Sequence, residues 1–377
     1  NAKIEEARSE LAIVKSAMEE FPIFNIGPYL QNVQPDGVTV MWETLEPADS
    51  TVYYGKSGLT REIHDPEPKT MHEITITGLD REKEYKYVAA SGRLASPEGT
   101  FKTKIRDNTP FTFAVWGDNR TDPSSHESVI DSMIPFEPDM AINVGDVVTT
   151  GVNYSEWADE YFLPMRRLAF SVPTYIAIGN HEYGGYGCGN PVEWFEKFVN
   201  HPPPGEYYFS FTYGNSYFMI LNPQEEKICY DVRPGSPQYE WMVNEFESDA
   251  YRNAAFRFVF FHEPPYSEGW SGGYYDGEAS LRAHLVPLFE KYEMDIVFCG
   301  HTHDYERGRW PKEDGPYYII TGGGGSSLDD TKYKEWQQID IMKFIYHFTL
   351  IKVDGKRMTF EAIDRSGKVF DRFEIKK

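Results

Sequence analysis

The chain has 377 residues, a formal net charge of −22 and 59 aromatic residues, namely 25 Phe, 26 Tyr and 8 Trp. Its length predicts two or three domains with a large aromatic core, and no apolar run approaches the roughly 20 residues that a transmembrane helix needs. The negative charge argues against binding to a nucleic-acid backbone, which depends on clustered Lys and Arg.

Residues 1–21 predict an amphipathic helix. Apolar residues recur at spacings of three and four among charged neighbours: Ile4, Ala7, Leu11, Val14, Met18 and Phe21. Such spacing places a narrow apolar stripe on one side of a helix. We expect this stripe to dock on the chain's own body, with a dimerising coiled coil as the alternative.

Residues 22–104 predict an all-β sandwich. Short strands such as VTVMWE, STVYYG and EYKYVAAS are separated by Gly-containing and Pro-containing turns, which is typical of a sandwich. Trp42 and Tyr85 match the aromatic core and the tyrosine corner of a fibronectin type III-like module. This stretch contains no cluster of catalytic residue types.

Residues 105–377 predict an α/β domain with an antiparallel end. Apolar strands alternate with plausible helices at 124–135, 154–169, 191–200, 237–248 and 279–292. Pro287 should delay or kink the last of these helices. After Tyr317, the runs YYIIT, HFTLIKV, RMTFEAI and VFDRFEIK predict strands joined by tight turns.

Five buried strands of this domain each end in residues that bind metals well. The segments are 116–120 (WGDNR), 144–147 (VGDV), 179–182 (GNHE), 261–263 (FHE) and 300–303 (GHTH). Loops at the carboxyl edge of a parallel sheet meet at one place. A single Asp after a strand more often caps a helix, and a single His is usually a core residue. Five such segments in order predict one shared site.

The residue types in these segments favour a two-metal centre. Carboxylate and amide oxygens suit hard cations, whereas imidazole suits iron, zinc and manganese. Six other histidines lie outside the segments, and we expect ordinary structural roles for them: His64, His72, His126, His201, His284 and His347.

The five segments resemble the calcineurin-like metallophosphoesterase superfamily. Segment 300–307 (GHTHDYER), segment 236–241 (SPQYEW) and the N-terminal sandwich are more similar still to its purple acid phosphatase branch. The resemblance covers about residues 22–377. It implies a four-layer αββα catalytic domain at 105–377 behind the fibronectin-like domain at 22–104, with only the helix at 1–21 outside it.

The resemblance also implies the metal ligands. Asp118, Asp146 and His303 would hold one metal ion, and Asp146 would bridge to a second one. The ligands of the second ion would be Asp146, Asn180, His262 and His301. A hydroxide shared by the two ions would attack a phosphate ester. The identity of the ions stays open among iron, manganese and zinc.

Two further residues are candidates for contact with the substrate. His181 directly follows a ligand, so we expect it to stabilise or protonate the leaving oxygen, with orientation of a ligand as the alternative. Arg120 could bind the phosphate through its guanidinium fork. A salt bridge to an acidic neighbour such as Asp122 is the alternative for Arg120.

The chain departs from the purple branch at two places. Thr149 stands where that branch has a Tyr that binds the ferric ion, three positions after Asp146. Gly272 and Gly273 stand where it has histidines that face the substrate. Both differences leave the acidic pH optimum and the iron content open, and acid catalysis should then depend more on His181.

The cysteines bear on the cellular compartment of the protein. Cys188 and Cys229 lie in loop-like sequence and could pair in an oxidising compartment, whereas Cys299 should be a buried core thiol. We expect a secreted or periplasmic protein, with a cytoplasmic one as the alternative.

These observations together predict an enzyme, a metal-dependent phosphomonoesterase that acts on a small phosphate ester. The first alternative is a phosphodiesterase or nucleotidase with the same centre. The second is a binding module whose metallo-domain has lost its activity.

Overall fold

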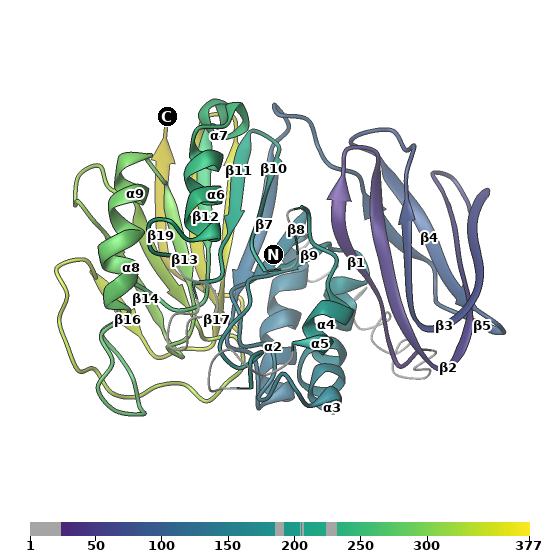
Figure 1. The fold of residues 1–377 in the computed structure, drawn as a ribbon, viewed down its shortest axis with the longest axis horizontal. Helices are drawn as coiled ribbons and strands as arrows, with labels where there is room; N and C mark the ends of the chain where they lie inside the picture. The colour runs from purple at the N-terminus through teal and green to yellow at the C-terminus, as the bar shows by residue number, and fades with distance from the viewer. Residues whose placement is uncertain (1–23, 185–191, 204, 206, 224–231) are drawn as a thin grey trace.

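The computed structural model describes residues 24–184, 192–203, 205, 207–223 and 232–377. The predicted helix at 1–21 and the predicted pairing of Cys188 with Cys229 lie outside these residues. The described part contains three β-sheets with helices on two outer faces (Figure 1).

The N-terminal strands form a six-stranded sheet of their own. β2 is its longest strand, and it pairs with β3 along its length, with β1 over its first half and with β4 over its second half. Two strands predicted separately are thus halves of one strand with irregular register between Glu43 and Ser50. The strands are β1 (Ile26–Gln34), β2 (Gly37–Gly55), β3 (Arg61–Ile76), β4 (Glu84–Ser91), β5 (Leu94–Ala95) and β6 (Gly99–Lys102).

The second sheet has the order β19-β18-β17-β7-β8-β9. Three of its strands are parallel, as predicted from their apolar runs, and the last three strands of the chain add an antiparallel half. The strands are β7 (Phe111–Trp116), β8 (Met140–Asn143), β9 (Thr174–Ile176), β17 (His347–Asp354), β18 (Arg357–Asp364) and β19 (Val369–Lys376).

The third sheet has the order β10-β11-β12-β13-β15-β14-β16. β15 pairs in parallel with β13, so the run YYIIT belongs to the parallel core and the antiparallel end of the chain begins later than predicted. β14 was not predicted from the sequence; it begins within the segment GHTHDYER and ends beyond it. The strands are β10 (Phe209–Tyr213), β11 (Ser216–Ile220), β12 (Phe256–Phe260), β13 (Ile296–Cys299), β14 (Tyr305–Arg309), β15 (Tyr317–Thr321) and β16 (Ile341–Lys343).

Each of the five helical segments predicted between residues 105 and 377 contains helix in the described part of the structure. Segment 154–169 is helical throughout but contains one π-helical stretch. Segment 279–292 breaks at Leu285 into α8 and α9, and Pro287 lies in the first turn of α9. The helices on the second sheet are α2 (Pro123–Met133), η1 (Ile134–Phe136), α3 (Tyr154–Glu156), the π-helix η2 (Trp157–Phe162), α4 (Leu163–Ala169) and α5 (Glu193–Phe198). Those on the third sheet are α6 (Pro237–Phe246), α7 (Asp249–Asn253), α8 (Ala279–His284) and α9 (Val286–Lys291).

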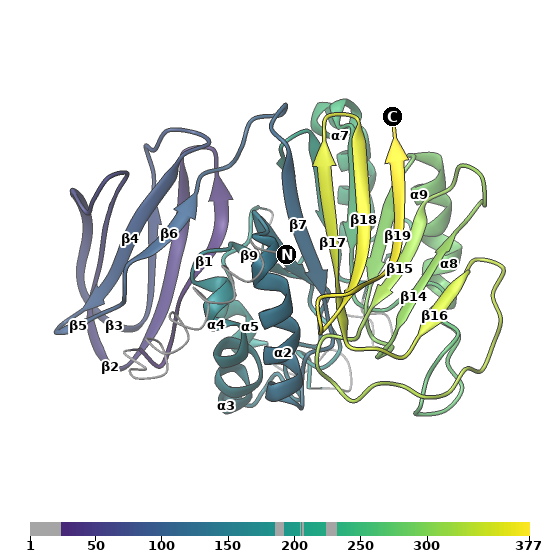
Figure 2. The same cartoon turned by 180° about the vertical axis from the view of Figure 1, so that it is seen from behind.

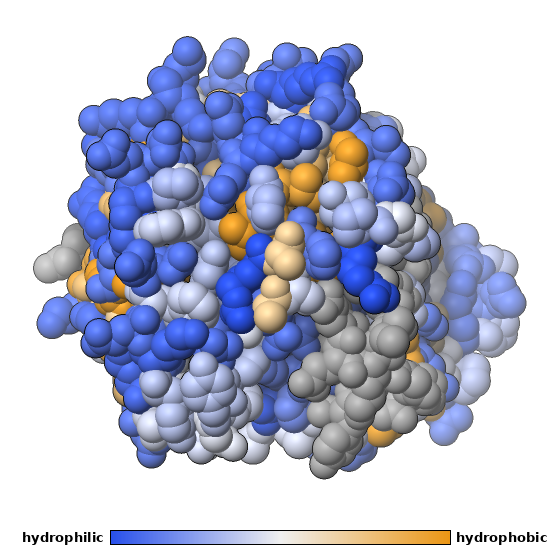
Figure 3. Space-filling model, turned by 60° about the vertical axis from the view of Figure 1, so that its left-hand side comes forward, coloured by the Kyte–Doolittle hydropathy of each residue, from blue (hydrophilic) through white to orange (hydrophobic). Residues whose placement is uncertain are grey.

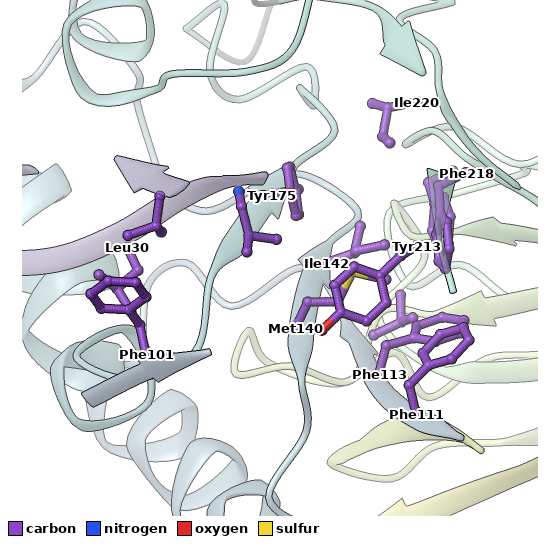
Figure 4. Packing of buried hydrophobic residues seen from close by; sticks show 14 of the residues in the cluster. Leu30, Phe101, Phe111, Phe113, Met140, Ile142, Tyr175, Tyr213, Phe218 and Ile220 are labelled. Carbon is purple, nitrogen blue, oxygen red and sulfur yellow. Dashed lines mark hydrogen bonds between the residues drawn. The ribbon is translucent and has the colours of Figure 1, made fainter. Parts of the chain in front are cut away.

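An aromatic core joins the second and third sheets face to face. Phe113 of β7 packs edge-on against Phe218 of β11 and Phe258 of β12, with ring centroids 5.1 and 5.0 Å apart. Figure 4 shows Phe111 and Phe113 turned toward Tyr213 and Phe218. Alternate residues of β7, such as Trp116, face the helical layer instead, as the two-residue period of a strand requires. The result is the predicted four-layer αββα sandwich (Figures 1 and 2).

The N-terminal sheet packs against the second sheet and its helices. The hydroxyl group of Tyr29 donates to the carbonyl of Phe198 at 2.8 Å, and that of Tyr87 donates to the carbonyl of Phe170 at 2.8 Å. Trp42 is fully buried in the N-terminal core. The hydroxyl group of Tyr85 accepts a hydrogen bond from the backbone of Asp80 at 2.9 Å.

Figure 3 shows a face on which hydrophilic side chains predominate. Among the described residues, the search for a helix with the length and apolarity of a membrane span finds none.

Candidate metal centre

The predicted ligands lie on loops that leave the carboxyl ends of five strands. Asp118 follows β7, Asp146 follows β8, and His301 follows β13, and these three residues have φ angles of 56°, 56° and 74°. A left-handed backbone costs a residue other than glycine about 1–2 kcal/mol. Such strain concentrates at functional sites, because the surrounding structure must hold the residue in place.

The glycines of these loops allow the ligands to approach each other. A Cβ atom at Gly179 would lie 2.4 Å from Oδ1 of Asp146, and one at Gly300 would lie 2.3 Å from Oδ2 of Asp118. The motifs GNHE and GHTH therefore need their glycines so that a carboxylate can pack closely against the backbone.

Backbone amides hold the two aspartates. The backbone N–H of His301 donates to both carboxylate oxygens of Asp118 at 3.0 Å. The backbone N–H of His181 donates to Oδ1 of Asp146 at 3.0 Å. Both carboxylates are buried and point toward the imidazoles.

Backbone carbonyls orient two of the three imidazoles. Nδ1 of His262 donates to the carbonyl of Val144 at 2.9 Å, and Nδ1 of His303 donates to the carbonyl of Ser327 at 2.8 Å. The Nε2 atoms are left to face the carboxylates. Nε2 of His262 lies 3.2 Å from Oδ1 of Asp146, and Nε2 of His303 lies 3.8 Å from Oδ1 of Asp118. A carbonyl partner of this kind typically fixes the tautomer of a metal-binding histidine.

The remaining ligands complete the cluster. Nδ1 of His301 lies 3.1 Å from Oδ1 of Asn180 and 3.3 Å from Nε2 of His262. One atom each of Asp146, His262 and His301 lie within 4.8 Å of one another. Mixed oxygen and imidazole donors at this spacing fit a borderline transition metal.

Buried charge shapes the pKa values in the cluster. Burial raises the pKa of Asp118. Burial also opposes ionisation of Asp146, but His262, His181 and Arg120 lower the pKa of Asp146 well below its usual value. Burial acts to lower the pKa of His262, yet Asp146 and Asp118 together raise it to about 10. Asp146 thus keeps a buried negative charge that a bound cation would stabilise.

Both predicted substrate contacts border this cluster. Nε of Arg120 lies 3.4 Å from Oδ2 of Asp146, and its Nη2 lies 3.3 Å from Nε2 of His303. The alternative partner Asp122 instead caps α2 through the backbone amides at 124 and 125. Nε2 of His181 lies 3.8 Å from Oδ2 of Asp146.

Aromatic rings line the histidine side of the cluster. The indole of Trp270 stacks on the ring of His301, with centroids 4.9 Å apart and an interplanar angle of 16°, and Tyr275 lies 5.0 Å from the same ring. A Cβ atom at Gly272 would lie 2.4 Å from Nε1 of Trp270. The glycine noted in the sequence therefore makes room for the indole.

Several supporting residues were not identified from the sequence. The carboxylate of Glu182 accepts from the backbone amides of Asp146, Val147 and Gly179 at 3.0, 2.8 and 2.6 Å. Burial and the charge of Asp146 raise the pKa of Glu182 to about 7. Its place in the segment GNHE was the only available signal. No feature of the sequence indicated Ser327, which follows four glycines and Ser326 in a loop.

Several residues for which we predicted structural roles lie in the core. His126 is fully buried between the carbonyl of Glu160 and the indole of Trp116. His72 and His347 are also buried, and Cys299 is a buried free thiol.

Known proteins provide an independent comparison. A family model described as calcineurin-like phosphoesterase matches residues 111–305. Probable purple acid phosphatase 20 of Arabidopsis thaliana is 25% identical over an alignment of 349 residues that covers 86% of this chain and 79% of that protein. Fe(3+)-Zn(2+) purple acid phosphatase 12 of the same plant is 25% identical over 338 residues, covering 78% and 70%.

A solved structure extends the comparison to the fold. The purple acid phosphatase isolated from seeds of yellow lupin (Lupinus luteus) superposes with a TM-score of 0.79 at 20% identity. The match covers 93% of this chain and 74% of that one. This likeness shows a shared architecture that includes the N-terminal sheet.

Proposed function

The chain belongs to the calcineurin-like phosphoesterase family, and we propose that it acts as a phosphomonoesterase through the ligand cluster at 118–303. It is a purple acid phosphatase-like hydrolase of phosphate esters that uses two metal ions. When bound, the ions supply the attacking hydroxide and neutralise charge on the phosphoryl group. The convergence of Asp146, His262 and His301 is the observation that carries the proposal.

The protein's own residues divide into two sets of ligands in this proposal. Asp118 and His303 would hold one ion, and Asn180, His262 and His301 would hold the other. Asp146 would bridge the two. Support comes from the position of Asp146, whose Oδ1 lies 3.2 Å from Nε2 of His262 while its Oδ2 lies 3.4 Å from Nε of Arg120, a residue that also contacts His303.

Arg120 and His181 would act on the substrate. The guanidinium of Arg120 would bind a terminal phosphoryl oxygen, and a monoester offers more of this negative charge than a diester does. His181 would pass its Nε2 proton to the leaving oxygen as the bond between phosphorus and that oxygen breaks. Nδ1 of His181 donates to the carbonyl of Thr149 at 2.6 Å, which leaves Nε2 for this task.

We also propose the domain boundaries 22–104 and 105–377 and a fibronectin type III-like character for the first domain. The contact of Tyr85 with the backbone of Asp80 supports a tyrosine corner there. Secretion or export to the periplasm is also part of this proposal, and it is not taken from the plant relatives.

A substrate panel with metal analysis tests the activity. The purified protein should contain metal and hydrolyse a phosphomonoester faster than the matching diester. Asp146→Ala should lose both metal and turnover, whereas Asp122→Asn, a change at a nearby helix cap, should keep both. A preference for the diester would favour the phosphodiesterase alternative. Full metal content without turnover on any phosphate ester would favour the inactive binding module.

A further inference from the structure

Two glutamates on the helical segment 154–169 accept hydrogen bonds from Thr149 and Thr150, whose shared peptide group holds His181. The backbone N–H of Thr150 donates to Oε2 of Glu156. The carbonyl on the other side of the same peptide group, that of Thr149, accepts from Nδ1 of His181 at 2.6 Å. A carboxylate and an imidazole are thus joined through one peptide group.

Glu160 holds Thr149 through the preceding peptide group, the one between Val148 and Thr149, and through the side chain. Its Oε2 accepts from the backbone N–H of Thr149 at 2.6 Å, and both its oxygens accept from the Thr149 hydroxyl at 2.9 and 3.0 Å. Asn153 in turn holds Glu156 through Nδ2 at 2.8 Å. The orientation of the Thr149 carbonyl is therefore determined by two carboxylates.

The local helix geometry supports a functional reason for this arrangement. Glu156 ends α3, and Glu160 lies in the π-helix η2 that follows it directly. A π-helical turn is rare and is frequently found at functional sites. This turn places Glu160 against Thr149, which is the position that departs from the purple branch.

We propose that Glu156, assisted by Glu160, is a positioning residue that orients His181 through the peptide group between Thr149 and Thr150. Hydrogen bonds in such a chain polarise one another, so the charge of Glu156 strengthens the carbonyl as an acceptor. The imidazole is then held with Nδ1–H on the carbonyl and Nε2 facing Asp146. This inference rests on the proposed acid role of His181.

Kinetics with two classes of leaving group test the inference. Glu156→Ala should slow hydrolysis of an alkyl phosphate by about 10–100-fold, the range for losing a partner that orients a functional imidazole. Hydrolysis of p-nitrophenyl phosphate, whose leaving group needs no proton, should change far less. Glu156→Gln keeps an acceptor for Thr150 and should lose less than Glu156→Ala. Asp159→Asn, at an exposed neighbour, should match the wild type.

A double variant separates orientation from general destabilisation. Glu156→Ala combined with His181→Ala should be no slower than His181→Ala alone, because Glu156 acts only through that imidazole. Multiplicative losses would overturn the inference. Equal losses for both leaving groups in Glu156→Ala would overturn it as well.

An NMR measurement keeps the test independent of turnover. Long-range proton–nitrogen spectra of the metal-free protein should show His181 as the Nδ1–H tautomer in the wild type. Glu156→Ala should move it toward a mixture of tautomers, and an unchanged tautomer would overturn the inference. Absence of turnover in the wild type would instead count against the proposed phosphatase activity and leave this spectroscopic test standing.

Discussion

The second and third sheets contribute different atoms to the candidate centre. The loops after β7, β8 and β9 carry the oxygen donors Asp118, Asp146 and Asn180, whereas the loops after β12 and β13 carry the three imidazoles. Asp118 and Asp146, two of the three oxygen donors, have left-handed φ angles. Of the three histidine ligands, only His301 has one.

Each half orients the other across the interface between the sheets. The carbonyl of Val144, after β8, orients His262, and the backbone N–H of His301, after β13, holds Asp118. The site therefore depends on correct stacking of the two sheets. The aromatic core around Phe113 and Phe258 thus also contributes to the geometry of the metal ligands.

Removing the residue that touches both halves should have the largest effect. Asp146→Ala should lower metal content toward zero and reduce kcat/KM by more than the roughly 10–100-fold expected for a merely orienting residue. His262→Ala should release only one ion. Elemental analysis and steady-state kinetics of both variants measure this, and equal metal contents in the two would contradict the bridging role.

His181→Ala should spare the metals and affect the chemistry. We expect both ions to remain and the rate to fall about 10²–10⁴-fold for substrates with poor leaving groups, the usual contribution of general acid catalysis. Substrates with acidic leaving groups should lose much less. A uniform loss would leave His181 with positioning alone.

His126, a buried residue of α2 that contacts Trp116 of β7, should make the free energy of unfolding depend on pH. Burial lowers the pKa of His126 to about 4 from 6.5. In the neutral form its Nδ1 donates to the carbonyl of Glu160, and its Nε2 accepts from Trp116 at 3.3 Å. The neutral form of His126 therefore contributes about 3 kcal/mol to the free energy of unfolding. This contribution is fully present above pH 6.5 and is lost as the pH falls toward 4.

Denaturant unfolding between pH 7 and pH 4 measures this contribution. His126→Gln removes the titrating group. Between pH 7 and pH 4, the free energy of unfolding of this variant should therefore fall by about 3 kcal/mol less than that of the wild type. The variant should be less stable than the wild type at pH 7, because its two hydrogen bonds are remade poorly. Parallel stability curves for the two proteins would contradict the assignment.

Gly145→Ala tests the contact between the two halves. A Cβ atom there would lie 2.7 Å from Nδ1 of His262, the atom that donates to Val144, and the φ angle of 103° disfavours alanine. We expect a loss of about 1–3 kcal/mol in stability and about 10–100-fold in metal affinity.

Gly78→Ala is the matched control. Its φ angle is 71° and a Cβ atom there meets nothing within 4 Å, so it should show only the backbone strain. Thermal unfolding and metal titration distinguish the two variants. Equal metal affinity in both would show that the halves do not depend on each other.

The sequence predicted the ligands better than the groups that orient them. Strand-end Asp, Asn and His residues follow apolar runs that predict parallel strands, so the site and the four layers could be inferred together. The carbonyls of Val144 and Ser327 could not, because any residue type offers a carbonyl. Glu182, Glu156 and Glu160 look like surface residues by composition, and only the fold turns them toward the backbone of the site.

The smallest expected effect concerns colour and follows from Thr149. A charge-transfer band needs a phenolate bound to a ferric ion, and the Thr149 hydroxyl is directed to Glu160. The nearest tyrosine in sequence, Tyr154, packs edge-on against Trp194 at 5.0 Å and donates to Glu43. Burial and Glu43 raise the pKa of Tyr154, which disfavours a phenolate.

We therefore expect a colourless or faintly coloured protein, even when it is loaded with ferric iron. Tyr154→Phe should leave the visible spectrum unchanged and cost about 1 kcal/mol of stability through the lost hydrogen bond to Glu43. Because no phenolate selects the ferric state, manganese or zinc should support turnover to the same degree as iron does. A visible band that disappears in Tyr154→Phe would mean that this ring leaves its contact with the N-terminal sheet and binds the metal.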